Sequence, residues 1–227
     1  MSPTDIAANA AAVRDRIAAA AARSGRDAAA VTLIAVTKTF PVGVCEAALA
    51  AGLADLGENY VKELREKATA LPDARWHYLG PVQTHTTNVV ADRASLVHGL
   101  GSVRAAQRLA RRSADAGHRL PALIQVDFTR ERSGVGPDEV EDFLGRIGDL
   151  EGLEVRGLMT LPPLTPDAEG ARPFFRSLRD LRDRLVAAYP GLVELSMGMS
   201  LDYEVAVEEG ATMVRVGTAL FGERSKR

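Results

Sequence analysis

The sequence has 227 residues, of which 46% are hydrophobic and 26% charged, a balance typical of a globular protein with one large or two small domains. The net charge of −2 gives no basic field that would attract nucleic acid, and the single cysteine, Cys45, excludes an internal disulfide and a cysteine-rich metal site. The first 25 residues are too charged for a signal peptide, and no apolar run reaches the length of a membrane span. We therefore expect a cytoplasmic protein with no nucleic-acid or membrane partner.

Residues 1–25 are predicted to form a helix. Ser2 can cap it, Pro3 suits its first turn, and Gly25 ends it. Its apolar stripe consists of Ile6, Ala10, Val13, Ile17 and Ala21. We expect this helix to cover one end of the fold. At the other terminus, residues 224–227 carry a short basic run that we expect to be a solvated tail.

From residue 32 onward, apolar runs of strand length alternate with amphipathic helical stretches. The eight runs cover residues 32–37, 53–57, 76–80, 95–99, 122–126, 155–159, 194–198 and 213–217. Between them, Ser102 can cap a helix that ends at Gly117, and Gly136 and Pro137 precede another helix. The apolar stripe of the longest of these helices consists of Phe174, Leu178, Leu181 and Leu185.

This alternation predicts parallel strands joined by right-handed crossovers, and the nearly continuous apolar strands predict a sheet that is covered on both faces. Eight such units in roughly 200 residues fit a closed (β/α)8 barrel. We therefore predict an α/β fold of the TIM-barrel type, with residues 1–227 as a single domain. An open, doubly wound sheet is the alternative.

Ligands of such barrels bind where the strands end, so residues at these positions are candidate site residues. The eighth strand places Arg215 on the face that it shares with Met213 and Gly217, and a guanidinium buried there needs a partner. An edge strand with a solvated arginine is the alternative. Gly217 and Thr218 end the strand and can present backbone amides to an anion.

A phosphate site is predicted between the loops after the seventh and eighth strands, as in many barrels of this type. The small and hydroxyl residues of these loops are Ser196, Gly198, Ser200, Gly217 and Thr218. The acids Asp202 and Glu204 oppose an anion beside the first loop, so the prediction relies more on the second loop. Tight turns that bind no ligand are the alternative.

Lys38 follows the first strand, at the mouth of the predicted barrel. Desolvation at this position favours the neutral amine, which is the nucleophile that forms a Schiff base, although a lone lysine on a rim is more often simply solvated. A lysine, a phosphate pocket and an inward arginine are together what pyridoxal phosphate requires: an amine for its aldehyde, donors for its phosphate and a partner for its ring nitrogen.

The histidines give a weaker signal. His77 stands inside an apolar strand, where a hydrogen-bonded core histidine is more common than a ligand-binding one. His85, His98 and His118 show no metal-ligand spacing, so we expect no metal site.

Six motifs follow one another with a characteristic spacing. They are Val36-Thr37-Lys38-Thr39, Gly57-Glu58-Asn59-Tyr60, Trp76-His77-Tyr78-Leu79-Gly80, Gly157-Leu158-Met159-Thr160, the block from Leu195 to Glu204, and Met213-Val214-Arg215-Val216-Gly217-Thr218. In these motifs the chain resembles the pyridoxal phosphate homeostasis proteins over nearly its whole length. The Ser-Met-Gly-Met-Ser block and the closing Arg-x-Gly-Thr block are the most specific.

The resemblance implies a barrel like the amino-terminal domain of alanine racemase, with pyridoxal phosphate bound covalently through a Schiff base. The residues that it implies are Lys38 for the covalent link, Ser200, Gly217 and Thr218 for the phosphate, Arg215 for the pyridine nitrogen, and Asn59, His77 and Met159 as further cofactor contacts. It also implies a role in binding, buffering and delivering pyridoxal phosphate, with pyridoxal phosphate-dependent apoenzymes as partners. We expect a monomer or a weak homodimer.

A cofactor carrier is the function that the resemblance implies, and two alternatives stay open: a pyridoxal phosphate-dependent amino-acid racemase, and an aldolase that uses Lys38 without a cofactor. An arginine beside the ring nitrogen disfavours protonation of that nitrogen. The ring is then a poorer electron sink than a ring whose nitrogen is partnered by an aspartate. The sequence ends at Arg227, shortly after the eighth strand, so we expect it to lack the second domain of racemases and to show no robust catalysis.

Three segments depart from the family pattern. They are residues 81–86 after the third strand, Gly99-Leu100-Gly101 after the fourth, and Asp127 at the end of the fifth. The lysine and phosphate motifs are intact, so the departures cast doubt only on what the family does through these other loops.

Overall fold

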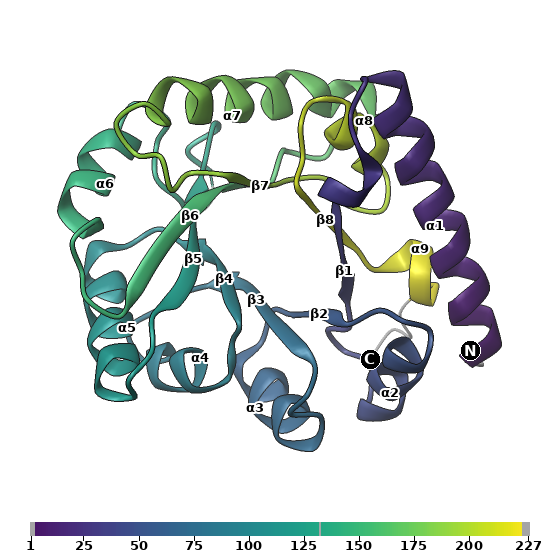
Figure 1. Cartoon of the computed structure of the whole chain (residues 1–227), viewed down its shortest axis with the longest axis horizontal. Helices are drawn as coiled ribbons and strands as arrows, with labels where there is room; N and C mark the ends of the chain where they lie inside the picture. Colours follow the sequence, from purple (N-terminus) through teal and green to yellow (C-terminus); the bar gives the residue numbers. More distant parts are fainter. Residues whose placement is uncertain (1–2, 132, 224–227) are drawn as a thin grey trace.

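The structure of the chain, a computed structural model, describes residues 3–131 and 133–223, so the cap expected at Ser2 and the tail expected at residues 224–227 lie outside the described residues. Eight parallel strands close into a barrel in sequence order (Figure 1). Their bounds are β1 Thr32–Val36, β2 Asp55–Glu58, β3 Arg75–Pro81, β4 Leu96–Leu100, β5 Leu120–Val126, β6 Leu153–Thr160, β7 Glu194–Ser196 and β8 Met213–Val216. The predicted runs coincide with these strands apart from small shifts at their ends.

Helices connect the strands and form the outer layer of the molecule (Figure 1). Their bounds are α1 Pro3–Arg23, α2 Val42–Ala50, α3 Val61–Ala70, α4 Thr87–Arg93, α5 Val103–Asp115, α6 Val140–Ile147, α7 Arg172–Leu185, α8 Tyr203–Glu208 and α9 Thr218–Phe221, with short 3-10 turns η1 Ala28–Ala30 and η2 Glu169–Ala171. Within the described ranges, no helix combines the length and the apolarity that crossing a membrane requires.

The barrel closes between β8 and β1, where Ile34 pairs with Arg215. β8 also pairs with β7, so Arg215 does not lie on an edge strand. This closure confirms the barrel over the open sheet. A small apolar cluster contributed by five of the strands consists of Ile34, Leu96, Leu123, Met159 and Met213. Because alternate residues of a strand share a face, Val36, His98 and Arg215 share the faces of Ile34, Leu96 and Met213, closer to the carboxyl ends.

Two helix ends follow the sequence prediction, and one stripe differs from it. Ser102 caps α5 by accepting a hydrogen bond from the amide of Ala105 at 3.4 Å, and Gly117 follows this helix with a φ of 79°. The buried stripe of α7 consists of Phe175, Leu178, Leu181 and Leu185. The prediction of Phe174 in this stripe was wrong: its i, i+4 spacing to Leu178 suits the helical face, but tertiary packing buries Phe175, which is three residues before Leu178. Phe174 instead packs edge-on against Phe128, with ring centroids 6.4 Å apart.

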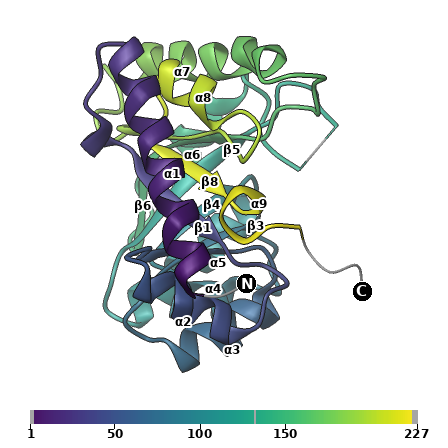
Figure 2. The same ribbon diagram turned by 90° about the vertical axis from the view of Figure 1, so that its right-hand side faces the viewer.

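α1 lies along the side of the barrel, where it packs against α2, α8 and α9 (Figure 2). α9 is a single turn, so the outer layer between α8 and α2 has room for another helix, and α1 fills it. The apolar stripe expected from the sequence is buried there: Ile6, Ala10, Val13, Ile17 and Ala21. The helix therefore covers the flank of the barrel, whereas the sequence had suggested one end.

Gly157 marks a close approach between β6 and β7. A Cβ built on this glycine would overlap the backbone carbonyl of Glu194, its partner in the strand register. Because both groups belong to strand backbones, neither can move aside easily. We expect Gly157→Ala to lower the free energy of unfolding by about 3 kcal/mol, measured by urea denaturation.

The matched control for this substitution is Gly145→Ala on α6. A Cβ at position 145 meets nothing within 4 Å, and an exposed helical alanine is favoured over glycine by about 0.5–1 kcal/mol. Equal effects of the two substitutions would contradict the steric explanation.

Candidate functional site

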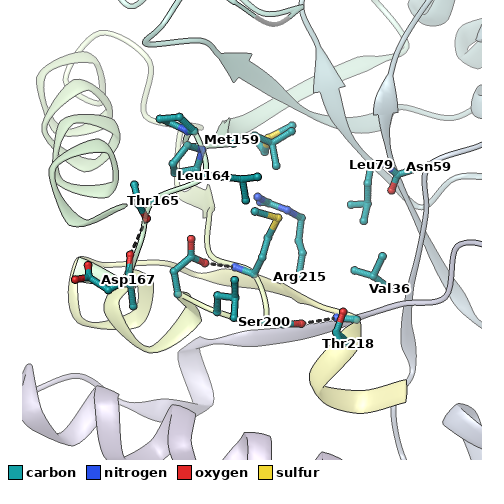
Figure 3. A pocket seen from close by; sticks show the side chains of 18 of the residues that line it. Val36, Asn59, Leu79, Met159, Leu164, Thr165, Asp167, Ser200, Arg215 and Thr218 are labelled. Atoms are coloured by element: carbon teal, nitrogen blue, oxygen red, sulfur yellow. Dashed lines mark hydrogen bonds between the residues drawn. The ribbon is translucent and has the colours of Figure 1, made fainter. Parts of the chain in front are cut away.

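A pocket of about 480 Å³ opens at the carboxyl ends of the strands, within the size range of small-molecule sites. Its walls come from the ends of β1, β2, β3, β6, β7 and β8 and from the loops that follow them. Figure 3 shows Asn59 and Leu79 on one wall and Leu164 on the opposite one, with Arg215 between them. Ser200 and Thr218 lie close together at the edge of the same cavity (Figure 3).

Seven of the eight cofactor-binding residues expected from the sequence line this pocket. They are Lys38, Asn59, Met159, Ser200, Arg215, Gly217 and Thr218. The described lining does not include the eighth, His77, which is buried in the barrel and hydrogen-bonded to Asp55 and His98. This position fits the hydrogen-bonded core histidine that its strand pattern favoured, and direct contact of His77 with a ligand stays a prediction.

Arg215 is a buried cation on the pocket wall, with only 4% of its surface exposed. Its Nη1 donates to Ser196 Oγ at 2.6 Å, and its Nη2 donates to the carbonyl oxygen of Thr160 at 2.9 Å. Both of these partners are neutral. Burial lowers the pKa of Arg215 to about 10, and the negative charge of Asp202 offsets only part of this decrease. A guanidinium carries five N–H donors, so the side chain has donors left for an acceptor in the pocket.

Ser200 joins the loops that follow β7 and β8. Its Oγ accepts the amides of Gly217 at 3.2 Å and Ala219 at 3.3 Å. A serine hydroxyl has two acceptor lone pairs and one proton, so a hydroxyl that accepts twice keeps its proton for donation to another group. α9 begins at Thr218, beside this hydroxyl, where the first amides of a helix lack intrahelical acceptors. The geometry suits a phosphate or another oxyanion.

The two acids that opposed an anion at this loop are engaged in other contacts. Asp202 Oδ1 accepts the amide of Met199 at 2.6 Å, and burial raises the pKa of this carboxyl in spite of that hydrogen bond. Glu204 pairs with Arg16 and Arg23 of α1. The repulsion that the sequence suggested is therefore weaker than expected, because Glu204 pairs with α1 and the Asp202 carboxylate is engaged by the amide of Met199.

Three charged side chains, which the sequence did not identify as a unit, hold the turn that carries Lys38. Lys67 Nζ donates to the carbonyl oxygen of Thr37 at 2.8 Å, to Glu58 Oε1 at 2.7 Å and to Glu63 Oε2 at 2.9 Å. We call Glu58, Glu63 and Lys67 the clamp. Since Thr37 directly precedes Lys38, the clamp fixes the backbone on one side of the pocket lysine.

The clamp also holds the other side of Lys38. Thr39 has a φ of 69°, in the left-handed region that a β-branched residue rarely adopts and that costs about 1–3 kcal/mol. The amide of Thr39 donates to Glu63 Oε2 at 2.7 Å, and Thr37 Oγ1 donates to Glu58 Oε1 at 2.6 Å. Lys38 therefore stands on a turn that is strained and is held by charged groups.

Glu58 and Lys67 form a coupled, buried pair. Burial raises the pKa of Glu58 to about 7, against the opposing hydrogen bond and charge of Lys67. Burial also disfavours the charge of Lys67, but the hydrogen bonds to Glu58 and Glu63 outweigh it and raise the pKa of this ammonium. Glu58 Oε2 has no hydrogen-bond partner among the described residues, so this carboxylate depends on Lys67 for its stability.

The loop over residues 161–168 forms a further wall of the pocket, and its Leu164 is 88% exposed. The segments that depart from the family pattern lie elsewhere. Neither His85 nor Asp127 belongs to the described lining, and the Asp127 carboxylate accepts the amide of Thr129 at 3.0 Å. The departures therefore leave the pocket itself unchanged.

Comparison with known proteins places the chain among relatives of nearly the same length. The model of the alanine racemase N-terminal domain matches residues 8–225. A protein of Pseudomonas aeruginosa PAO1 named pyridoxal phosphate homeostasis protein is 41% identical over 223 residues, which cover 96% of each chain. PipY of Synechococcus elongatus PCC7942, solved with PLP bound, is 35% identical with a TM-score of 0.81, covering 92% of this chain and 100% of that chain.

A more distant structure shares the fold alone. Alanine racemase of Clostridium difficile 630, in complex with cycloserine, is 16% identical with a TM-score of 0.73, covering 86% of this chain and 56% of that chain. The barrel of this chain is thus the barrel of the racemase N-terminal domain, as the sequence predicted. With its close relatives named alike and matched over nearly their whole length, the chain belongs to the family of pyridoxal phosphate homeostasis proteins.

Proposed function

We propose that this protein binds pyridoxal phosphate at the carboxyl end of its barrel, covalently through Lys38, and that it holds and delivers the cofactor for other proteins. One observation carries the proposal: Lys38, Arg215 and the Ser200–Gly217–Thr218 group line a single cavity of about 480 Å³. These are the amine, the cation and the anion site that the aldehyde, the ring nitrogen and the phosphate of this cofactor need. The names of the relatives and the PLP-bound PipY structure support the same ligand.

The residues present fit the cofactor chemically. A buried guanidinium whose protein partners are both neutral favours an acceptor or an anion beside it, and Arg215 is in this situation. Ser200 already accepts two amides, which leaves its hydroxyl proton for a phosphate oxygen. The apolar side chains of Val36, Leu79 and Met159 supply the flat, dry walls on which an aromatic ring packs.

In this proposal, each residue has a defined task. Lys38 would hold the cofactor through its side-chain amine, whose neutral form is the nucleophile that condenses reversibly with an aldehyde. Ser200 and Thr218 would donate hydrogen bonds to the phosphate at the turn that Gly217 forms, and Arg215 would donate a hydrogen bond to the unprotonated ring nitrogen. When bound, the cofactor supplies an electrophilic imine carbon conjugated to an electron-withdrawing ring.

A carrier is favoured over a racemase by the protonation chemistry of the pocket. Racemisation removes a proton from one face of a substrate and returns one to the other face, so it needs a second acid–base group opposite the lysine. Besides Lys38 and Arg215, the titratable residues of the described lining are Asp167 and Asp202, and each accepts a backbone amide, from Gly170 and Met199 respectively. Arg215 would also keep the ring a weak electron sink. Delivery to apoenzymes then relies on the reversibility of the imine.

The phosphate end of the site is tested by Ser200→Ala. The substitution removes a donor to the phosphate and leaves two amides without their acceptor, so we expect pyridoxal phosphate to bind about 10- to 100-fold more weakly in equilibrium titrations. Pyridoxal, which has no phosphate, is the matched control ligand, and its affinity should stay the same. If the variant weakens both ligands equally, Ser200 does not bind the phosphate.

A further inference from the structure

A continuous chain of hydrogen bonds crosses the interior of the barrel, from Asp55 on β2 to Arg215 on β8. Asp55 Oδ1 lies 3.0 Å from His77 Nε2, and His77 Nδ1 lies 3.0 Å from His98 Nε2. His98 Nδ1 lies 2.8 Å from Ser196 Oγ, which accepts Arg215 Nη1 at 2.6 Å. We call Asp55, His77, His98 and Ser196 the relay.

The two ends of the chain are a group that can only donate and a group that can only accept. Arg215 has N–H donors and no acceptor, whereas an ionised Asp55 has acceptors and no donor. Burial alone would raise the pKa of Asp55, but its hydrogen bonds with Arg75 and His77 outweigh burial and hold the pKa of this carboxyl well below its usual range. Asp55 is therefore ionised at neutral pH, and in one arrangement that satisfies both ends every hydrogen bond of the chain runs toward it.

This arrangement assigns a proton to each member of the relay. Ser196 accepts from Arg215 and donates its hydroxyl proton to His98 Nδ1. His98 then donates through Nε2–H to His77 Nδ1, and His77 donates through Nε2–H to Asp55. In this arrangement, the proton that each imidazole donates is on Nε2.

A second proton on either imidazole would disturb this arrangement. A proton on His77 Nδ1 would meet the Nε2–H of His98, and a proton on His98 Nδ1 would make the Ser196 hydroxyl turn its own proton away. Burial, together with the neighbouring His77 and the charge of Arg215, holds the pKa of His98 well below its ordinary value. The other charged groups that act on the chain are Arg75, paired with Asp55, and Asp202, which acts on Arg215.

We propose that the relay residues are positioning residues for Arg215, whose guanidinium they fix in one orientation, fully charged and with its remaining N–H donors available to the pocket. The inference rests on the proposed function, because the acceptor that Arg215 serves is the ring nitrogen of pyridoxal phosphate. A nitrogen that faces a fixed N–H donor and a positive charge stays unprotonated. The relay thus sets the protonation state of the bound cofactor from inside the barrel.

The first test needs no ligand and no variant in the relay. The chain has four histidines, and two of them, His85 and His118, are exposed. In the ¹⁵N imidazole spectrum of the ligand-free protein, assigned with His85→Gln and His118→Gln, we expect His77 and His98 to show a single tautomer with the proton on Nε2. Averaging of both tautomers at His98, or a proton on its Nδ1 at neutral pH, would overturn the relay.

The second test measures the effect of the relay on the protonation of the bound cofactor. Pyridoxal phosphate labelled with ¹⁵N in its ring reports ring protonation through its nitrogen chemical shift, and we expect an unprotonated ring in the wild type between about pH 6 and 8. Ser196→Ala cuts the link between His98 and Arg215, so the midpoint of ring protonation should move to higher pH by on the order of one unit. The matched control is Ser113→Ala, which removes another fully buried serine whose hydroxyl has no partner among the described residues.

The outcomes separate the relay from the proposed function. An unchanged ring signal in Ser196→Ala, or the same shift in Ser113→Ala, would show that the relay does not position Arg215. If pyridoxal phosphate does not bind the wild type, the proposed function fails, and the imidazole spectrum of the ligand-free protein still decides whether the relay exists.

Discussion

Replacing Lys38 with alanine abolishes the covalent capture of pyridoxal phosphate while the barrel stays folded. Lys38 is half-buried on a turn, and its side chain lines the pocket, so the loss of the amine removes the only bond that the proposal makes covalent. We expect the visible imine band to disappear and the affinity to fall by on the order of 100-fold, since the phosphate contacts and Arg215 remain. Absorbance titration and equilibrium dialysis measure the two effects.

The matched control for Lys38→Ala is Lys62→Ala, at an exposed lysine on α3. This variant should keep the wild-type band and affinity, and both variants should melt within a few degrees of the wild type. An imine band of wild-type strength in Lys38→Ala would show that another amine carries the cofactor.

Replacing Lys67 with methionine lowers the free energy of unfolding by about 3–5 kcal/mol, the largest effect on stability that we expect from a single side chain. The substitution removes the cation that binds Glu58, Glu63 and the carbonyl oxygen of Thr37, and it leaves the Glu58 carboxylate buried and unpaired. Because the clamp also holds the turn at Lys38, imine formation should be impaired as well. Urea denaturation measures the first effect and absorbance titration the second.

Two further variants test the reason for this loss. Lys62→Met alters an exposed lysine of the same helix and should change stability by no more than about 0.5 kcal/mol. Adding Glu58→Gln to Lys67→Met removes the unpaired charge and should restore part of the stability. Equal stabilities of the single and double variants would show that the buried charge is not the cause.

The pH dependence of Lys67→Met gives an independent check. Burial already raises the pKa of Glu58 to about 7 in the wild type, and the variant lacks the opposing hydrogen bond and charge of Lys67, so this pKa rises further. An acid with a raised pKa in the folded state binds protons more tightly when folded than when unfolded, so it costs stability as the pH increases above the unfolded value. The deficit of the variant relative to the wild type should therefore be smaller at pH 5 than at pH 8.

The sequence predicts the barrel well because strands buried on both faces leave a clear apolar signature that repeats eight times. The order of the strands then follows from the handedness of the crossovers. The position of α1 is not predictable in this way, since it depends on the shortness of α9, which leaves a gap in the outer layer that only the closed structure reveals. The choice of Phe175 over Phe174 similarly depends on tertiary packing.

The pocket residues could be predicted because they stand where strands end, and this rule needs only the chain order. The relay could not, since Asp55, His77, His98 and Ser196 are far apart in the chain and meet only through the register of the closed barrel. A signal did exist: these polar residues interrupt otherwise apolar strands. In the clamp, Glu63 and Lys67 stand four residues apart on α3, a spacing that indicates an ion pair, but nothing in the sequence links Lys67 to the backbone before Lys38.

The central claim, that Lys38 carries pyridoxal phosphate at the mouth of the barrel, is tested most directly by peptide mapping after reduction. The chain has four lysines, Lys38, Lys62, Lys67 and Lys226, so a borohydride-reduced adduct can be assigned to one of them by mass spectrometry. We expect one cofactor per chain, on the peptide that contains Lys38. An adduct mainly on another lysine, or no adduct in a protein that binds the cofactor, would contradict the assignment of Lys38.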